Sequence, residues 1–88
     1  MGKPSEDEIR QFARDAFDAV TKEIGVSCSS KDKRRVCELV ATGLIDSIDN
    51  VESLSTMPEE RRDLVLSMAA SNSIRKHIYK QRPDLAPS

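Results

Sequence analysis

The sequence predicts an all-α fold: a small single domain built as a bundle of about four short amphipathic helices. Apolar residues recur three and four positions apart, which places them on one face of a helix. Ser or Thr precedes Glu by three positions at two places, as in the capping boxes that begin helices. No segment alternates apolar and polar residues as a half-buried strand does. We expect one domain over residues 1–88, with frayed ends at 1–4 and 84–88.

The first helix is expected to begin after Ser5. The hydroxyl of Ser5 can accept a hydrogen bond from the backbone N–H of Glu8, and the Glu8 carboxylate can reach back to the cap. Gly25 ends this helix, because glycine adopts the left-handed conformation without a Cβ clash. The apolar stripe between them consists of Ile9, Phe12, Ala13, Ala16, Phe17, Val20 and Ile24.

The second helix is expected to follow a cap at Ser29 or Ser30 and to run to about Ile48, with Asn50 as a left-handed terminator. Its apolar arc is Val36, Cys37, Val40, Ala41, Leu44 and Ile48. Leu39 and Ile45 widen this arc on either side, so we expect the second helix to be the central, most buried one.

A third helix is expected to start at the second capping box, from Thr56 to Glu59, with Pro58 in its first turn. Its predicted core stripe is Leu64, Val65, Met68 and Ala69. The polar run Ser-Asn-Ser at 71–73 is expected to interrupt it and to cap a short fourth helix. Ile74 and Ile78 are the predicted core contacts of that helix, and Pro83 stops it.

Composition excludes several classes of function. Two cysteines separated by eight residues and a single histidine indicate neither a zinc site nor a disulfide framework, and we expect no metal and no cofactor. There is no glycine-rich phosphate loop and no carboxylate pair in an apolar face, so we expect no enzyme and no catalytic residue. No apolar run is long enough for a signal peptide or a membrane span, and we expect a cytoplasmic protein without membrane contact.

One stretch, "TGLIDSIDNVE" from Thr42 to Glu52, resembles the attachment site of acyl and peptidyl carrier proteins. The resemblance implies that Ser47 receives a phosphopantetheine arm. In carriers this serine opens its helix, whereas here it follows an apolar-periodic segment and is predicted to lie near the end of a helix, angled toward Val36 and Val40. The carrier function therefore stands as an alternative.

A second alternative is a nucleic-acid binder of the helix-turn-helix kind. The net charge of the chain is −1, but residues 73–88 carry four basic groups and one acidic group. Side chains that could contact phosphates are Arg75, Lys76, Lys80 and Arg82, with Tyr79 among them. Cations in the last turns of a helix also offset its dipole, which accounts for the same pattern without any ligand.

The function that we favour is protein–protein interaction or self-association by a regulatory or adaptor module. Four apolar side chains fall outside the predicted core stripes: Leu39, Ile45, Leu66 and Tyr79. Four helices of this length have difficulty covering all of them. We therefore predict that they contribute to a surface for another protein or for a second copy of the chain.

Overall fold

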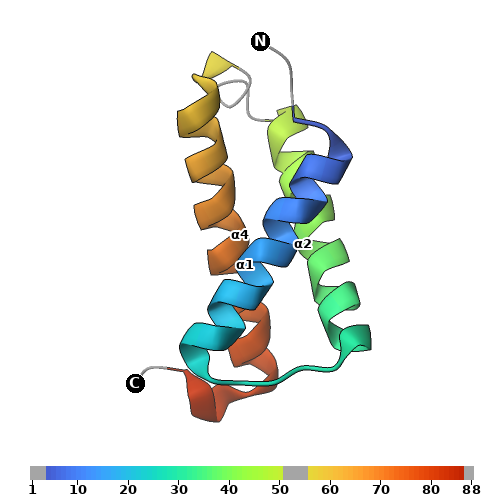
Figure 1. Cartoon of the computed structure of the whole chain (residues 1–88), viewed down its shortest axis with the longest axis vertical. Helices are drawn as coiled ribbons and strands as arrows, with labels where there is room; N and C mark the ends of the chain where they lie inside the picture. Colours follow the sequence, from blue (N-terminus) through green and yellow to red (C-terminus); the bar gives the residue numbers. More distant parts are fainter. Residues whose placement is uncertain (1–3, 51–55, 87–88) are drawn as a thin grey trace.

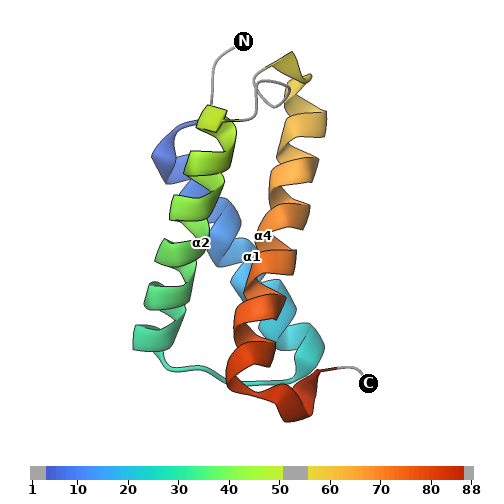
Figure 2. The same cartoon turned by 180° about the vertical axis from the view of Figure 1, so that it is seen from behind.

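The computed structural model describes residues 4–50 and 56–86. It shows three α-helices, α1 (Glu6–Ile24), α2 (Ser30–Asn50) and α4 (Glu59–Gln81), and a short 3₁₀ turn, η1 (Pro83–Leu85). The helices lie side by side, with α1 and α4 running in one direction and α2 in the other (Figures 1 and 2). The predicted all-α fold is confirmed, and the described residues form three long helices where about four short ones were expected. None of the described helices is both long and apolar enough to cross a bilayer.

The predicted boundaries of α1 and the start of α2 match the structure. The N–H of Glu8 donates to Ser5 Oγ at 3.1 Å, and the N–H of Asp32 donates to Ser29 Oγ at 3.1 Å. Gly25 has a left-handed φ of 80° and ends α1. Asn50 is different, because it belongs to α2 and no described residue other than Gly25 has a positive φ. The prediction that Asn50 is a left-handed terminator was wrong.

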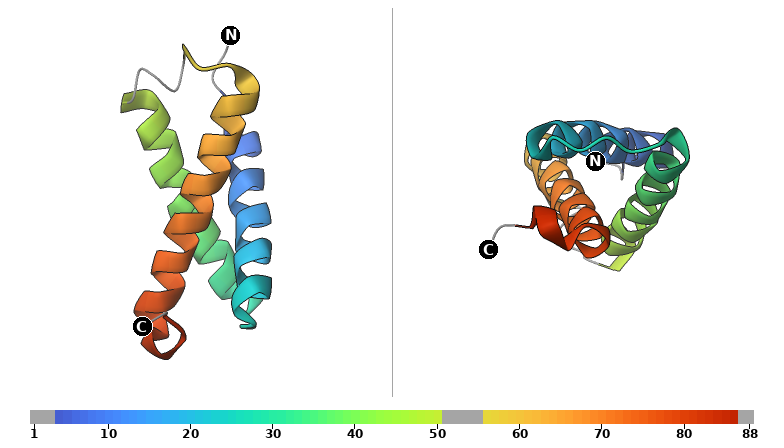
Figure 3. Two further views of the ribbon diagram at one scale, coloured as in Figure 1. Left: turned by 90° about the vertical axis from the view of Figure 1, so that its left-hand side faces the viewer. Right: turned by 90° about the horizontal axis from the view of Figure 1, so that it is seen from below.

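The core lies between the three helices and contains all six residues predicted for the arc of α2. Its buried apolar residues are Ile9, Ala13, Ala16, Phe17, Val20, Val36, Cys37, Val40, Ala41, Leu44, Ile48, Leu66, Ala70, Ile74 and Ile78. Helix α1 packs against both other helices, whereas α2 and α4 meet over a smaller surface and cross as an open X (Figure 3). The central helix is therefore α1 and not α2 as predicted, although α2 does have the most buried residues, six against five in each of the other two helices.

Helix α4 differs most from the prediction, because it continues without a break through 71–73. Its buried positions, Arg62, Leu66, Ala70, Ile74 and Ile78, recur every four residues. Serine and asparagine disfavour a helix interior by only a few tenths of a kcal/mol each, less than the burial of one isoleucine contributes. The packing of Ile74 and Ile78 therefore sets the orientation of the whole helix.

The start of α4 also differs from the prediction, and the chain ends can be compared with it only in part. The N-cap of α4 is Pro58, which makes no side-chain cap hydrogen bond, so α4 begins after Pro58 and not at the predicted cap Thr56. Most of the residues expected to fray lie outside the described part of the chain. Within it, η1 follows α4 directly, and Leu85 is half-buried against the core.

Candidate interaction surfaces

The structure does not bring the four predicted protein-binding residues together. Leu39 projects from α2 with 55% of its surface exposed, and Ile45 and Tyr79 are half-buried. Leu66 is 1% exposed at the centre of the core. The prediction that Leu66 contributes to an outer surface was wrong, because a continuous α4 points it between α1 and α2.

Three residues predicted for the core are exposed in its place: Leu64, Met68 and Ala69. Leu64 is 60% and Met68 is 58% exposed, and they lie one helical turn apart on α4. Continuing along the same face at spacings of four, three and four residues gives Asn72, Arg75 and Tyr79. We call Leu64, Met68, Asn72, Arg75 and Tyr79 the α4 outer stripe. A shallow hollow of about 340 Å³ lies along it beside Met68, Asn72 and Arg75.

Two of the four cations predicted to contact nucleic acid are held in ion pairs. Arg75 Nη2 lies 2.9 Å from Glu23 Oε2 on α1, and Arg75 Nη1 donates to Asn72 Oδ1 at 3.2 Å. Arg82 donates through Nη2 and Nε to the Asp84 carboxylate at 3.0 and 3.1 Å. These hydrogen bonds raise the pKa of Arg82 and lower the pKa of Asp84. Both arginines therefore have their charge partly neutralised within the chain.

Lys76 and Lys80 are exposed and form no ion pair with another described residue. They lie one turn apart on one flank of α4, while Arg75 reaches across the other flank to Glu23. The four predicted cations thus divide into two that are paired within the chain, Arg75 and Arg82, and two that have no ion pair with a described residue. Lys80, in the last turn of α4, lies where the negative end of the helix dipole favours a cation.

Ser47 lies on the surface of α2, three residues before its end. Its Oγ donates to the backbone carbonyl of Gly43 at 2.9 Å. The predicted position near the end of a helix is confirmed, but the predicted angle toward the core is wrong. Ser47 is therefore exposed at the edge of the apolar arc, one residue before the buried Ile48.

A basic surface between α1 and α2 was missed by the sequence analysis. A cavity of about 230 Å³ is lined by Arg10, Arg14, Ser30, Lys33, Arg34, Cys37 and Glu38. It continues over the outer face of α2 as a wider depression lined by Lys31, Arg34, Arg35, Glu38, Leu39 and Thr42. We call these residues together the α1–α2 basic groove. Glu38 is the one carboxylate among its lining residues.

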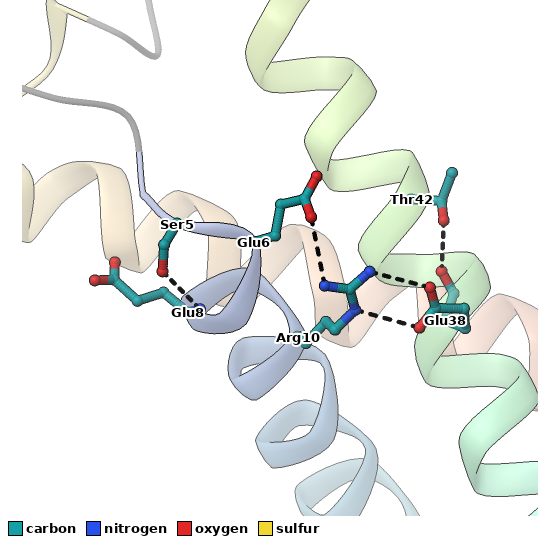
Figure 4. Close-up of polar contacts among 6 residues, drawn as sticks. All are labelled: Ser5, Glu6, Glu8, Arg10, Glu38 and Thr42. Atoms are coloured by element: carbon teal, nitrogen blue, oxygen red, sulfur yellow. Dashed lines mark hydrogen bonds and ion pairs between the residues drawn. The ribbon is translucent and has the colours of Figure 1, made fainter.

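Arg10 and Glu38 tie the two walls of this groove together (Figure 4). Arg10 Nη2 and Nε lie 3.3 and 3.4 Å from the two Glu38 oxygens, and Arg10 Nη1 lies 3.6 Å from Glu6. The hydrogen bond to Glu38 is the main reason why the pKa of Arg10 is raised. Thr42 Oγ1 donates to the Glu38 backbone carbonyl at 2.9 Å. The only carboxylate of the groove is therefore already occupied by a cation.

The remaining cations divide into one that is paired and four that are not. Lys33 Nζ lies 2.7 Å from Asp18 Oδ1 and 6.0 Å from the centre of the Phe17 ring. Four cations are exposed and form no ion pair with another described residue: Arg14, Lys31, Arg34 and Arg35. Arg14 does donate a hydrogen bond to Gln11 at 2.9 Å. The groove thus has unneutralised positive charge on both of its walls.

The charges of α2 oppose its own dipole. Helices α1 and α4 have acidic first turns and a lysine in the last turn, the arrangement that the helix dipole favours. Helix α2 has Lys31 and Lys33 beside a single acidic residue, Asp32, in its first turn, and no basic residue in its last. Each misplaced charge costs about 0.3–1 kcal/mol at low salt. The sequence "KDKRR" at 31–35 could have shown this, because cations are unusual where a helix begins.

No metal site or activated side chain accompanies these surfaces in the described part of the chain. Its His, Cys, Asp and Glu residues do not form a group of three that could hold a metal ion. Cys28 is exposed, whereas Cys37 is buried, and its thiol donates to the Ala13 carbonyl at 3.7 Å. Burial raises the pKa of Cys37, so its thiol stays protonated and unreactive at neutral pH.

Comparisons of the chain with protein-family models, with curated proteins and with solved structures returned no match.

Proposed function

We propose that this chain is a non-enzymatic interaction module, adaptor or regulatory in kind, that binds another protein or a second copy of itself through the α4 outer stripe. The observation that supports it is the exposure of Leu64 and Met68 on one turn of α4, while the opposite face of the same helix is buried. Full burial of a side chain of this size contributes about 1.5–3 kcal/mol, so a partner that covers both gains appreciable affinity.

The polar residues of the α4 outer stripe would orient a bound partner. Asn72 and Arg75 lie between the apolar pair and Tyr79, and Arg75 is already held by Glu23. A side chain held in place loses less conformational entropy when a partner binds, and arginine and tyrosine are enriched in protein interfaces. A helix of the partner lying along α4 would contact Leu64 and Met68 on successive turns and Tyr79 about three turns further on.

A second copy of the chain fits the same geometry. The stripe is nearly symmetric in sequence about the Ser71–Asn72 peptide, since Leu64 and Tyr79, like Met68 and Arg75, are equidistant from it. Two α4 helices paired antiparallel across a twofold axis would place Leu64 against Tyr79 of the second copy. The self-association form of the proposal is tested directly by sedimentation equilibrium.

The experiment compares Leu64→Ser/Met68→Ser with Leu39→Ser, a matched control that removes an equally exposed leucine from another face. Sedimentation equilibrium measures self-association, and capture of partners on immobilised protein measures binding to other proteins. We expect the double variant to lose self-association, which Leu39→Ser keeps, and to lose the captured partners that bind through the α4 outer stripe. Association should depend weakly on salt, because the contact is mainly apolar. Association that survives the double variant and is lost in the control would overturn the proposal.

A further inference from the structure

We infer that the α1–α2 basic groove is a docking surface for an acidic segment of a partner protein, distinct from the α4 outer stripe. The groove presents four cations without ion pairs among the described residues, Arg14, Lys31, Arg34 and Arg35, and its one carboxylate is occupied by Arg10. This excess of positive charge on a chain with a net charge of −1 is matched by a segment rich in Asp and Glu.

The arrangement along α2 specifies the form of the segment. Lys31, Arg35, Leu39 and Thr42 follow one another at spacings of four, four and three residues, so they share one face of α2 over about three turns. Arg34 and Arg14 border this face toward α1. A partner helix of about three turns would therefore place carboxylates against Lys31, Arg34 and Arg35 and an apolar side chain against Leu39.

The exposed leucine favours a protein segment over a nucleic acid. A phosphate backbone offers no apolar group to cover Leu39, and single-stranded nucleic acids bind where aromatic side chains can stack on bases. None of the residues that line the groove is aromatic. An acidic amphipathic peptide satisfies both the cations and Leu39.

The cations of the groove are not explained by the stability of the fold. Lys31 lies in the first turn of α2, at the positive end of the helix dipole, and Arg34 and Arg35 follow in the next turn. Removing their charge should leave the thermal stability of the free domain unchanged or raise it. Exposed cations that form no ion pair with the described residues and that begin a helix against its dipole are typical of a functional surface.

The probe is a labelled synthetic peptide of about three helical turns that carries glutamates and one leucine on the same face. Its affinity for the full chain is measured by fluorescence anisotropy at low salt. In Lys31→Gln/Arg34→Gln/Arg35→Gln, the loss of three exposed charge pairs should weaken binding on the order of tenfold or more. Lys76→Gln/Lys80→Gln is the matched control, since it removes exposed cations from α4 and should leave affinity within about twofold.

Two further comparisons complete the test. Leu39→Ser should weaken binding of the leucine-containing peptide but not of an all-glutamate peptide of the same length, and the α4 variant Leu64→Ser/Met68→Ser should bind both as the wild type does. The inference is overturned if the peptide does not bind, if the α4 lysine variant loses as much affinity as the triple variant, or if a single-stranded oligonucleotide of equal charge binds more tightly than the peptide. A lower melting temperature for the triple variant would also overturn it, because the cations would then serve the fold.

Discussion

Replacement of Leu66 by Ala tests whether α4 is one continuous helix. Leu66 is 1% exposed and is among the largest side chains that the core fully encloses. Removing three carbons from such a site costs the lost burial and leaves a cavity, together about 2–5 kcal/mol. For a domain of this size each kcal/mol lowers the melting temperature by roughly 4–8 °C, so a loss of about 3 kcal/mol lowers it by roughly 12–24 °C.

The matched control is Leu64→Ala, two positions away on the same helix with 60% of the side chain exposed. Its effect should stay within about 0.5 kcal/mol, the usual size for surface substitutions. Urea denaturation followed by far-ultraviolet circular dichroism gives the free energy of unfolding of both variants. If Leu64→Ala costs as much as Leu66→Ala or more, the orientation of α4 is wrong and the helix breaks at 71–73.

Two other predictions concern Cys37 and Ser47. Burial raises the pKa of Cys37 above its usual value of 9.0, so the protonated thiol stabilises the fold fully below that pH, and this contribution is lost as the pH rises through the pKa of the folded state. The unfolding free energy should therefore fall less steeply above about pH 9 in Cys37→Ala than in the wild type. Equal slopes for the two proteins would show that Cys37 is not the group responsible. Ser47 should keep its unmodified mass after co-expression with a broad-specificity phosphopantetheinyl transferase, because it lies near the end of α2 rather than at the start of a helix; a mass gain that disappears in Ser47→Ala would support the carrier alternative.

The sequence was sufficient to predict which residues of α2 are buried, but not which residues of α4 are. The reason is the number of helix faces that carry apolar residues. In α2 the apolar arc is continuous, and all six predicted residues are buried. In α4 six of the seven residues from Leu64 to Ala70 are apolar, so several orientations bury a similar area. Only the burial of Ile74 and Ile78 determines which of these orientations α4 adopts. Assigning these two to a separate helix removed the information that would have placed Leu66 inside.

The basic groove could be predicted only in part. The run of cations at 31–35 is visible in the sequence and is at odds with the dipole of the helix that it begins. Its other wall comes from Arg10 and Arg14, which are more than fifteen residues earlier in the chain. No local pattern states that α1 packs beside α2 in the register that joins Arg10 to Glu38. The tertiary contact had to be seen before the two groups of cations could be recognised as one surface.

The direction of the helices explains why the cations at the start of α2 are unfavourable for the stability of the free domain. Helices α1 and α4 begin at the same end of the bundle, where their acidic first turns meet the positive ends of their dipoles (Figure 1). Helix α2 runs the other way, so its basic first turns lie at the end where α4 carries Arg75, Lys76 and Lys80. The cations of α2 therefore oppose their own helix dipole and add to an end of the molecule that is already basic. Lys33 is compensated by its ion pair with Asp18. Lys31, Arg34 and Arg35 form no ion pair with another described residue, and the acidic partner proposed above would give them the favourable contact that the free domain does not provide.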